Sequence, residues 1–150
     1  MTPAVTIRGI HHIAIRTRDL DASLRFYTGA LGCTVRHTWS MPEREITRAA
    51  MLKTGDGLSF IELFEYKDSP APERGDARAG SDPAGNNPLL HLAVTVDNAE
   101  TAYRKAVSCG CRPCSPPGSV MLGEPPVPVR NAVISGPDGE ILEFIEPGGF

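Results

Sequence analysis

The sequence has no run of basic residues and no long hydrophobic run. Its formal net charge is -3, so it lacks the positive surface that binds nucleic acid, and no nucleic-acid partner is expected. No apolar stretch approaches the roughly 18 residues that a membrane helix needs. The first nine residues lack the apolar core of a signal peptide. These absences predict a cytoplasmic protein with no membrane partner.

Cysteine is also scarce, with four residues in the chain. Three of them, Cys109, Cys111 and Cys114, form a C-x-C-x-x-C pattern that can serve a metal or redox site. No fourth zinc ligand lies nearby in the sequence, and disulfides are rare in the cytoplasm. Cys111 instead matches Cys33, because each follows a glycine that ends a predicted helix. Both are expected to be small buried residues that open a strand.

The composition is that of a globular protein, with 41% hydrophobic and 22% charged residues over a length of 150. That length is sufficient for one domain with its own core. Residues 10–33 predict a strand with alternating faces, then a helix that is capped by Asp19 and ends at a glycine. Residues 89–111 predict the same order, with Asp97 as the cap.

Further strands follow each of these units. They are predicted at residues 33–41, 45–54 and 58–66 in the first half, and at 129–135 and 140–146 in the second. Residues 67–88, rich in Pro, Gly, Asp and Ala, are predicted to be a surface loop between the halves. Residues 115–128 hold five of the fourteen prolines. Because proline donates no ladder hydrogen bond, this segment is predicted to leave the sheet as a stiff excursion over its open face.

A single period near 80 residues relates the two halves. The segment TGDGLSFIELFE at 54–65 matches SGPDGEILEFIE at 135–146. Two copies of a half-domain that cannot bury its own sheet face are expected to pack together. The prediction is therefore one domain, residues 1–150, with a first module at about 8–66, a linker at 67–88 and a second module at about 89–147.

Four residues of the repeat indicate metal chemistry: His12, Glu62, His91 and Glu143. The two histidines are 79 residues apart and the two glutamates 81, so each pair occupies one position of the repeat. An ionised carboxylate among apolar strand neighbours costs several kcal/mol unless it is paired or bound to a cation. Two imidazoles and two carboxylates suit a divalent ion such as zinc, nickel, iron, cobalt or manganese.

Each of the four also has an ordinary alternative. A strand histidine is more often a packed or surface residue than a ligand, and a strand glutamate usually faces solvent. The coincidence of all four in a repeat favours the metal site. His11 is an alternative to His12, and strand parity favours His12, because it shares a face with Ala14 as His91 does with Ala93.

Two longer motifs resemble those of a known superfamily. HHIAIRTRDLDASLRFYTGALGC, from residue 11, resembles the opening strand–helix signature of the vicinal oxygen chelate superfamily, and GPDGEILEFIEP, from residue 136, resembles its closing one. The superfamily includes glyoxalase I, methylmalonyl-CoA epimerase, extradiol dioxygenases, and fosfomycin- and bleomycin-resistance proteins. The resemblance implies an α+β fold of two tandem βαβββ modules, whose mixed sheets form a cupped, barrel-like surface around a metal ion. It implies the same four ligands, His12, Glu62, His91 and Glu143.

The ligand set resembles that of glyoxalase I, which has an acidic ligand at the position of Glu62. The resemblance implies one divalent ion (Zn, Ni, Co, Fe or Mn) and a lyase or isomerase of the glyoxalase I or epimerase type. Such an enzyme transfers a proton through a metal-bound enediolate of a small oxygenated metabolite. Glu143 is implied as the catalytic base, with Glu62 as the second choice. A homodimer is expected, and the metal site is completed either within one chain or across two.

Two other functions remain open. One is an iron-dependent extradiol-type dioxygenase, and the other is a non-catalytic protein that binds a drug or metabolite. The intact set of four ligands counts against the binding protein. Candidate anchors for an anionic group of the substrate are Arg16, Arg48 and Arg130. An apolar pocket could be lined by Trp39, Met41, Met51, Phe60 and Met121, although a core position is the simpler explanation of each.

Overall fold

The computed structural model describes residues 7–68 and 88–149 and has the predicted α+β architecture. The first module contains β1 (His12–Thr17), α1 (Leu20–Arg25), the π-helical turn η1 (Phe26–Ala30), β2 (Thr34–Met41), the 3-10 helix η2 (Pro42–Arg44), β3 (Ile46–Lys53) and β4 (Phe60–Tyr66). The second contains β5 (Leu92–Thr95), α2 (Ala99–Ser108), β6 (Arg112–Leu122), β7 (Val127–Ser135) and β8 (Ile141–Ile145). Most of the predicted linker, residues 69–87, lies outside the described residues.

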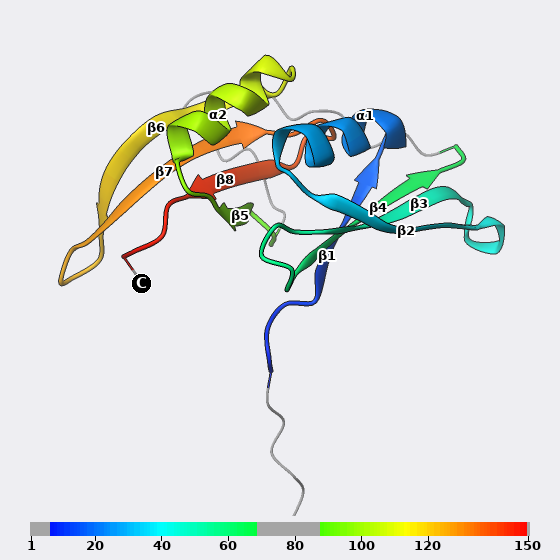
Figure 1. Cartoon of the computed structure of the whole chain (residues 1–150), viewed down its shortest axis with the longest axis horizontal. Helices are drawn as coiled ribbons and strands as arrows, with labels where there is room; N and C mark the ends of the chain where they lie inside the picture. The colour runs from blue at the N-terminus through cyan, green and yellow to red at the C-terminus, as the bar shows by residue number, and fades with distance from the viewer. Residues whose placement is uncertain (1–6, 69–87, 150) are drawn as a thin grey trace, which may run out of the picture.

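Each module forms a four-stranded mixed sheet, and the two sheets have equivalent strand orders. The order is β1-β4-β3-β2 in one sheet and β5-β8-β7-β6 in the other. In both, the first strand is parallel to the fourth and the remaining pairs are antiparallel. Both helices lie on the same side of the two sheets, and the opposite faces have no helix over them (Figure 1). The repeat therefore builds two cupped sheets rather than a closed barrel.

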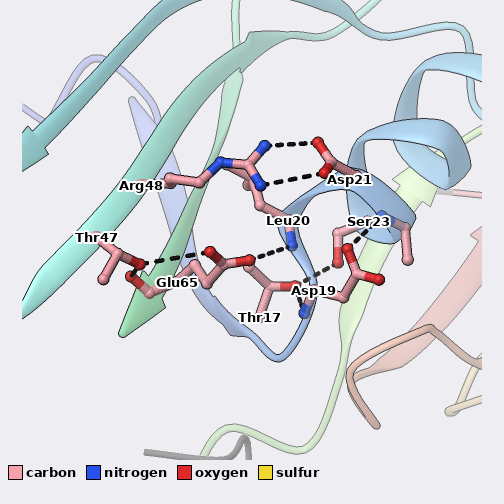
Figure 2. A network of polar contacts seen from close by, with 9 residues as sticks. Thr17, Asp19, Leu20, Asp21, Ser23, Thr47, Arg48 and Glu65 are labelled. Atoms are coloured by element: carbon pink, nitrogen blue, oxygen red, sulfur yellow. Dashed lines mark hydrogen bonds and ion pairs between the residues drawn. The ribbon is translucent and has the colours of Figure 1, made fainter. Parts of the chain in front are cut away.

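The first helix is fastened to β4 by a network of polar contacts (Figure 2). Asp19 is the N-cap, as the sequence predicts, and its carboxylate accepts a backbone N–H of the first turn at 3.0 Å. Glu65 of β4 accepts the N–H of Leu20 at 2.8 Å, and Arg48 of β3 donates two hydrogen bonds to Asp21. The sheet thereby satisfies donors that a helix cannot satisfy within its own first turn.

The second helix uses the same arrangement, with one correction to the predicted cap. Its N-cap is Asn98, whose side chain accepts a first-turn N–H at 2.8 Å, so the prediction of Asp97 is wrong by one residue. Either residue type can cap a helix, and Asn98 is the one that directly precedes the first helical residue. Glu146 accepts the N–H of Ala99 at 2.9 Å, which is the contact that Glu65 makes in the first module.

The proline-rich segment is a strand, contrary to the prediction. Among the residues that the structure describes, β6 pairs only with β7 and forms the edge of the second sheet. Its register shifts between Pro113 and Ser115 and again between Ser115 and Gly118, so Pro116 and Pro117 fall in an irregularity of the pairing. An edge strand has one side without ladder hydrogen bonds, and a bulge leaves a residue unpaired. Both features tolerate a residue without an N–H, so the proline density excludes a central strand but not an edge.

The hydrophobic core lies between the sheets and the helices and extends through both modules. Leu63 of β4 and Phe144 of β8 are fully buried in it. Cys33 and Cys111 are each 7% exposed, which confirms that they are matched buried residues. Within residues 7–68 and 88–149, no helix has the length and apolar character needed to cross a membrane.

A buried polar cluster joins the two modules at the turn between β7 and β8. Asp138 accepts the hydroxyl of Ser23 at 2.6 Å and the backbone N–H of Arg18 at 2.9 Å. Glu140 accepts the hydroxyl of Tyr27 at 2.6 Å. Burial raises the pKa of Glu140 to about 7, and the neighbouring Asp138 adds to this shift against the hydrogen bond from Tyr27, which lowers it. The turn from the second module is thus held by the first module's helix.

The stability of the fold should depend on pH through Glu140. Its folded-state pKa of about 7 lies above the ordinary value of 4.5, so the folded chain holds this proton more tightly than the unfolded chain. This contribution is complete below pH 4.5 and is lost as the pH rises through 7, by about 3 kcal/mol in all. Urea unfolding of E140Q should show little of this decline. E43Q, which removes an exposed carboxylate, should retain it, and an undiminished decline in E140Q would contradict the assignment.

Candidate metal centre

The candidate ligands lie on the sheet faces that turn away from the helices, which we call the outer faces. In β1, His12, Ala14 and Arg16 are exposed, whereas Ile15 packs against the core, as the two-residue period of a strand requires. Glu62 of β4 lies opposite Ala14 in the parallel pairing. Its side chain therefore shares the outer face of the first sheet with His12.

The first histidine–glutamate pair is His12 with Glu62. The Nε2 atom of His12 lies 3.3 Å from a carboxylate oxygen of Glu62, and the two side chains are 40% and 14% exposed. His11 instead stacks on Phe60, with ring centroids 5.2 Å apart, and its Nδ1 lies 2.9 Å from Nδ1 of His12. Of the two neighbouring histidines, His12 is therefore the one that faces the carboxylate.

The second pair is His91 with Glu143, in the equivalent place of the second sheet. The Nε2 atom of His91, which directly precedes β5, lies 3.1 Å from a carboxylate oxygen of Glu143. The side chains are 46% and 15% exposed, close to the values of the first pair. Ala93 lies opposite Glu143 as Ala14 lies opposite Glu62. The repeat in sequence is thus a repeat of one local geometry.

The second pair has an additional partner, which the sequence did not reveal. The side-chain amide of Asn131 in β7 donates to the other carboxylate oxygen of Glu143 at 2.5 Å. Asn131 lies opposite Ile145, and the matching place in the first sheet, opposite Phe64, is taken by Ala49. An isolated asparagine in an apolar strand was the available signal. Its target could not be inferred without the register of β7 on β8.

The geometry of each pair fits two ligands of one metal ion. Nitrogen and oxygen ligands about 2.0–2.2 Å from one ion, at the angles of tetrahedral or octahedral coordination, lie roughly 3.0–3.5 Å apart. The two observed separations are 3.3 and 3.1 Å. Among residues 7–68 and 88–149, however, no three His, Cys, Asp or Glu side chains come close enough to hold an ion. One copy of the described chain therefore presents two separate histidine–glutamate pairs, and Cys109, Cys111 and Cys114 are not part of any such group of three in it.

Only one of the three candidate arginine anchors lies on an outer face. Arg48 and Arg130 point to the helix side of their sheets, where Arg48 binds Asp21 and Arg130 lies 3.4 Å from Glu146. Arg16 lies on the outer face of the first sheet, four residues along β1 from His12. Its guanidinium carbon is 4.2 Å from the centre of the Tyr66 ring.

The candidate lining residues do not belong to the buried core. Trp39, Met51 and Phe60 are each partly exposed, and by register they lie on the outer face that carries Glu62. Met41 is partly exposed at the end of β2. Met121 is 61% exposed on the β6–β7 hairpin, which projects to one end of the molecule (Figure 1).

Comparison with known proteins identifies the class. The model of the Glyoxalase/Bleomycin resistance protein/Dioxygenase superfamily matches residues 9–144, so the chain belongs to this superfamily. The resemblance read from the two sequence motifs is thereby confirmed.

Several relatives at low identity are named as enzymes. The chain is 28% identical over 138 residues to lactoylglutathione lyase of Haemophilus influenzae, with 91% of each chain covered. It is 28% identical over 129 residues to 2-epi-5-epi-valiolone epimerase of an Actinomyces species, covering 77% of this chain and 63% of the epimerase. By contrast, it spans 36% of a probable chloroplastic lactoylglutathione lyase of Arabidopsis thaliana, at 25% identity over 94% of this chain.

Solved structures share the fold. Glyoxalase I from Zea mays superposes with a TM-score of 0.69 at 21% identity, covering 93% of this chain and 44% of the maize chain. At that identity the likeness establishes the two-module architecture and nothing about the reaction.

Proposed function

We propose that the protein is a metal-dependent lyase or isomerase that moves a proton next to a carbonyl group of a small oxygenated metabolite. The observation that carries the proposal is the doubled histidine–glutamate pair. His12 with Glu62 and His91 with Glu143 occupy equivalent places, with separations of 3.3 and 3.1 Å that suit ligands of one ion. Relatives named as a lyase and an epimerase support this class of reaction.

The four side chains would hold one divalent ion between two copies of the chain. Each pair lies on an open sheet face, with its histidine 40% or 46% exposed. The described part of a single copy brings no third His, Cys, Asp or Glu side chain to either pair. In a symmetric dimer, the first module of one copy can face the second module of the other, which creates two complete sites.

The bound ion would supply Lewis-acid polarisation of two neighbouring substrate oxygens. The chain's own groups would do the rest. A carboxylate beside the carbon that loses a proton can act as general base, and Glu143 is the first choice. Asn131 donates a hydrogen bond to one of its oxygens at 2.5 Å, which orients the carboxylate. Arg16, on the outer face with His12 and Glu62, is placed to bind an anionic substituent.

Metal content and hydrogen exchange test this proposal together. The purified chain, dialysed against Zn²⁺, Ni²⁺, Co²⁺, Fe²⁺ or Mn²⁺, should retain about one ion per chain, two per dimer. The loaded protein should catalyse exchange of the hydrogen next to the carbonyl in simple 2-hydroxy ketones and in hemithioacetals of 2-oxoaldehydes, followed by NMR in deuterated water. Iron-dependent oxygen uptake with a catechol, and no exchange, would identify a dioxygenase instead and overturn the proposal.

A further inference from the structure

The aromatic residues of this chain are few, and their placement is uneven. The sequence has nine: five Phe, three Tyr and one Trp. Four of them lie on the outer face of the first sheet: Trp39, Phe60, Phe64 and Tyr66. Strands β5 to β8 contain one aromatic residue, Phe144, and it is fully buried on the helix side. The two sheets thus have equivalent metal-ligand pairs but different surroundings.

Four side chains form a continuous line across β2 and β4, which we call the aromatic row: His37, Trp39, Phe64 and Tyr66. His37 stacks on Trp39 with centroids 5.6 Å apart and planes 19° from parallel. Trp39 meets Phe64 edge-to-face at 6.0 Å and 87°, and Phe64 meets Tyr66 at 6.4 Å. His37 is exposed and the other three are partly exposed, so water reaches the row.

The row lies directly beside the first metal-ligand pair. Phe64 follows Glu62 by two residues on the same face of β4, and Trp39 reaches it across Ala49 of β3. On its other side, Glu62 lies opposite Ala14 of β1. A molecule that contacts Glu62 is therefore within reach of the rings of the row.

The composition of the row favours a flat, conjugated partner over an aliphatic one. Offset and edge-to-face contacts leave ring faces available for a further ring, and such ring pairs are favourable beyond their buried area. At one end of the row the guanidinium of Arg16 lies over Tyr66, 4.2 Å from the ring centre. That charge suits a ring that bears an anionic group. A purely apolar surface of a protein partner would have to cover this arginine and Glu62 as well.

We propose that the aromatic row binds a flat conjugated ring of the substrate, so that the substrate class is an aromatic or similarly conjugated compound with neighbouring oxygens and an anionic group. This inference rests on the proposed function, because it places the ring next to the reacting oxygens at Glu62. Unlike the proposed function, the inference predicts which compounds bind, and it does so both with and without metal.

Binding of two matched anions tests the inference. Phenylglyoxylate and glyoxylate carry the same neighbouring oxygens and the same charge, and they differ by one phenyl ring. Calorimetry on the full-length chain, with a chelator and again with added Zn²⁺, should show phenylglyoxylate bound about tenfold more tightly than glyoxylate. Trp39 is the chain's one tryptophan, so its fluorescence should change with phenylglyoxylate and not with glyoxylate.

Two matched variants test whether the phenyl ring of phenylglyoxylate binds at the aromatic row. F64L keeps an apolar side chain on the outer face and should lower the affinity for phenylglyoxylate about tenfold, with glyoxylate unchanged. Y103L removes a partly buried ring of α2, on the helix side of the sheets, and should change neither affinity by more than about threefold. Circular dichroism checks that both variants fold.

Each outcome bears on one proposal separately. Equal affinity for the two anions would overturn the inference, even if the chain binds metal and catalyses exchange. A change of oligomeric mass in F64L with the ring preference intact would also overturn it, because the row would then be a contact between copies. A tenfold ring preference in a chain that binds no metal would uphold the aromatic row and overturn the proposed function.

Discussion

H12A and H91A are each expected to lower the affinity of the protein for Zn²⁺ by at least about a hundredfold. Each variant removes one of the four proposed ligands, and loss of even a supporting contact behind a ligand typically costs 10–100-fold. The affinity is measured by competition with a coloured chelator. Equal losses at the two positions are predicted because the two histidines stand in the same relation to their glutamates, at 3.3 and 3.1 Å.

H37A provides the matched control for these variants. His37 is an exposed histidine on the same outer face as His12, and its structural partner is the ring of Trp39. Its removal should leave zinc affinity unchanged. If H11A abolishes binding while H12A does not, the parity argument for His12 is wrong and His11 is the ligand.

E143Q is expected to slow hydrogen exchange in the substrate by about 10²–10⁴-fold, because an amide cannot take the proton that a carboxylate base removes. The substitution keeps the shape of the side chain and its place beside Asn131 and His91. Exchange is followed by NMR in deuterated water at saturating metal, so that weaker metal binding does not enter the rate.

E62Q is the matched comparison, since Glu62 occupies the same place in the first module, where Ala49 stands at the position of Asn131. We expect a smaller loss of exchange in E62Q than in E143Q. The reverse order would assign the base to Glu62, and unchanged exchange in both variants would remove the carboxylates from the proton transfer altogether.

Much of this architecture could be predicted from the sequence because the same strand–helix pattern occurs in both halves. Apolar and polar residues alternate along residues 10–17 and along a matching strand near residue 91. Because a strand has only two faces, this alternation predicts which side chains point away from the core. The Asp19 cap and the matched burial of Cys33 and Cys111 both follow from such local rules.

Features that depend on pairing partners could not be predicted in this way. Nothing in the proline-rich segment tells an edge strand from an excursion, because the distinction lies in which strand is its neighbour. The contact of Asn131 with Glu143 requires the register of β7 on β8. The same holds for the aromatic row, whose members come from β2 and β4 and meet only once β3 separates those strands by the right register.

The polar contacts between the two modules also could not be predicted from the sequence. Asp138 and Glu140 lie in a turn that reads as ordinary turn sequence, yet both carboxylates are directed at the first module's helix. In the repeat, their positions correspond to Gly57 and Ser59, so neither carboxylate has a counterpart at the matching position of the first module. The sequence repeat explains the strand order that the two modules share. Residues without an equivalent in the repeat, such as Asp138 and Glu140, distinguish one module from the other.

Two copies of the chain are proposed to complete each metal site, and mixing the two histidine variants tests this arrangement most directly. H12A and H91A should each bind little Zn²⁺ alone. In a mixed dimer, one site would contain both substitutions and the other neither. After subunit exchange in an equal mixture, about a quarter of the wild-type zinc sites should reappear. If the mixture exchanges subunits and no zinc binding returns, each site lies within a single chain and the account is wrong.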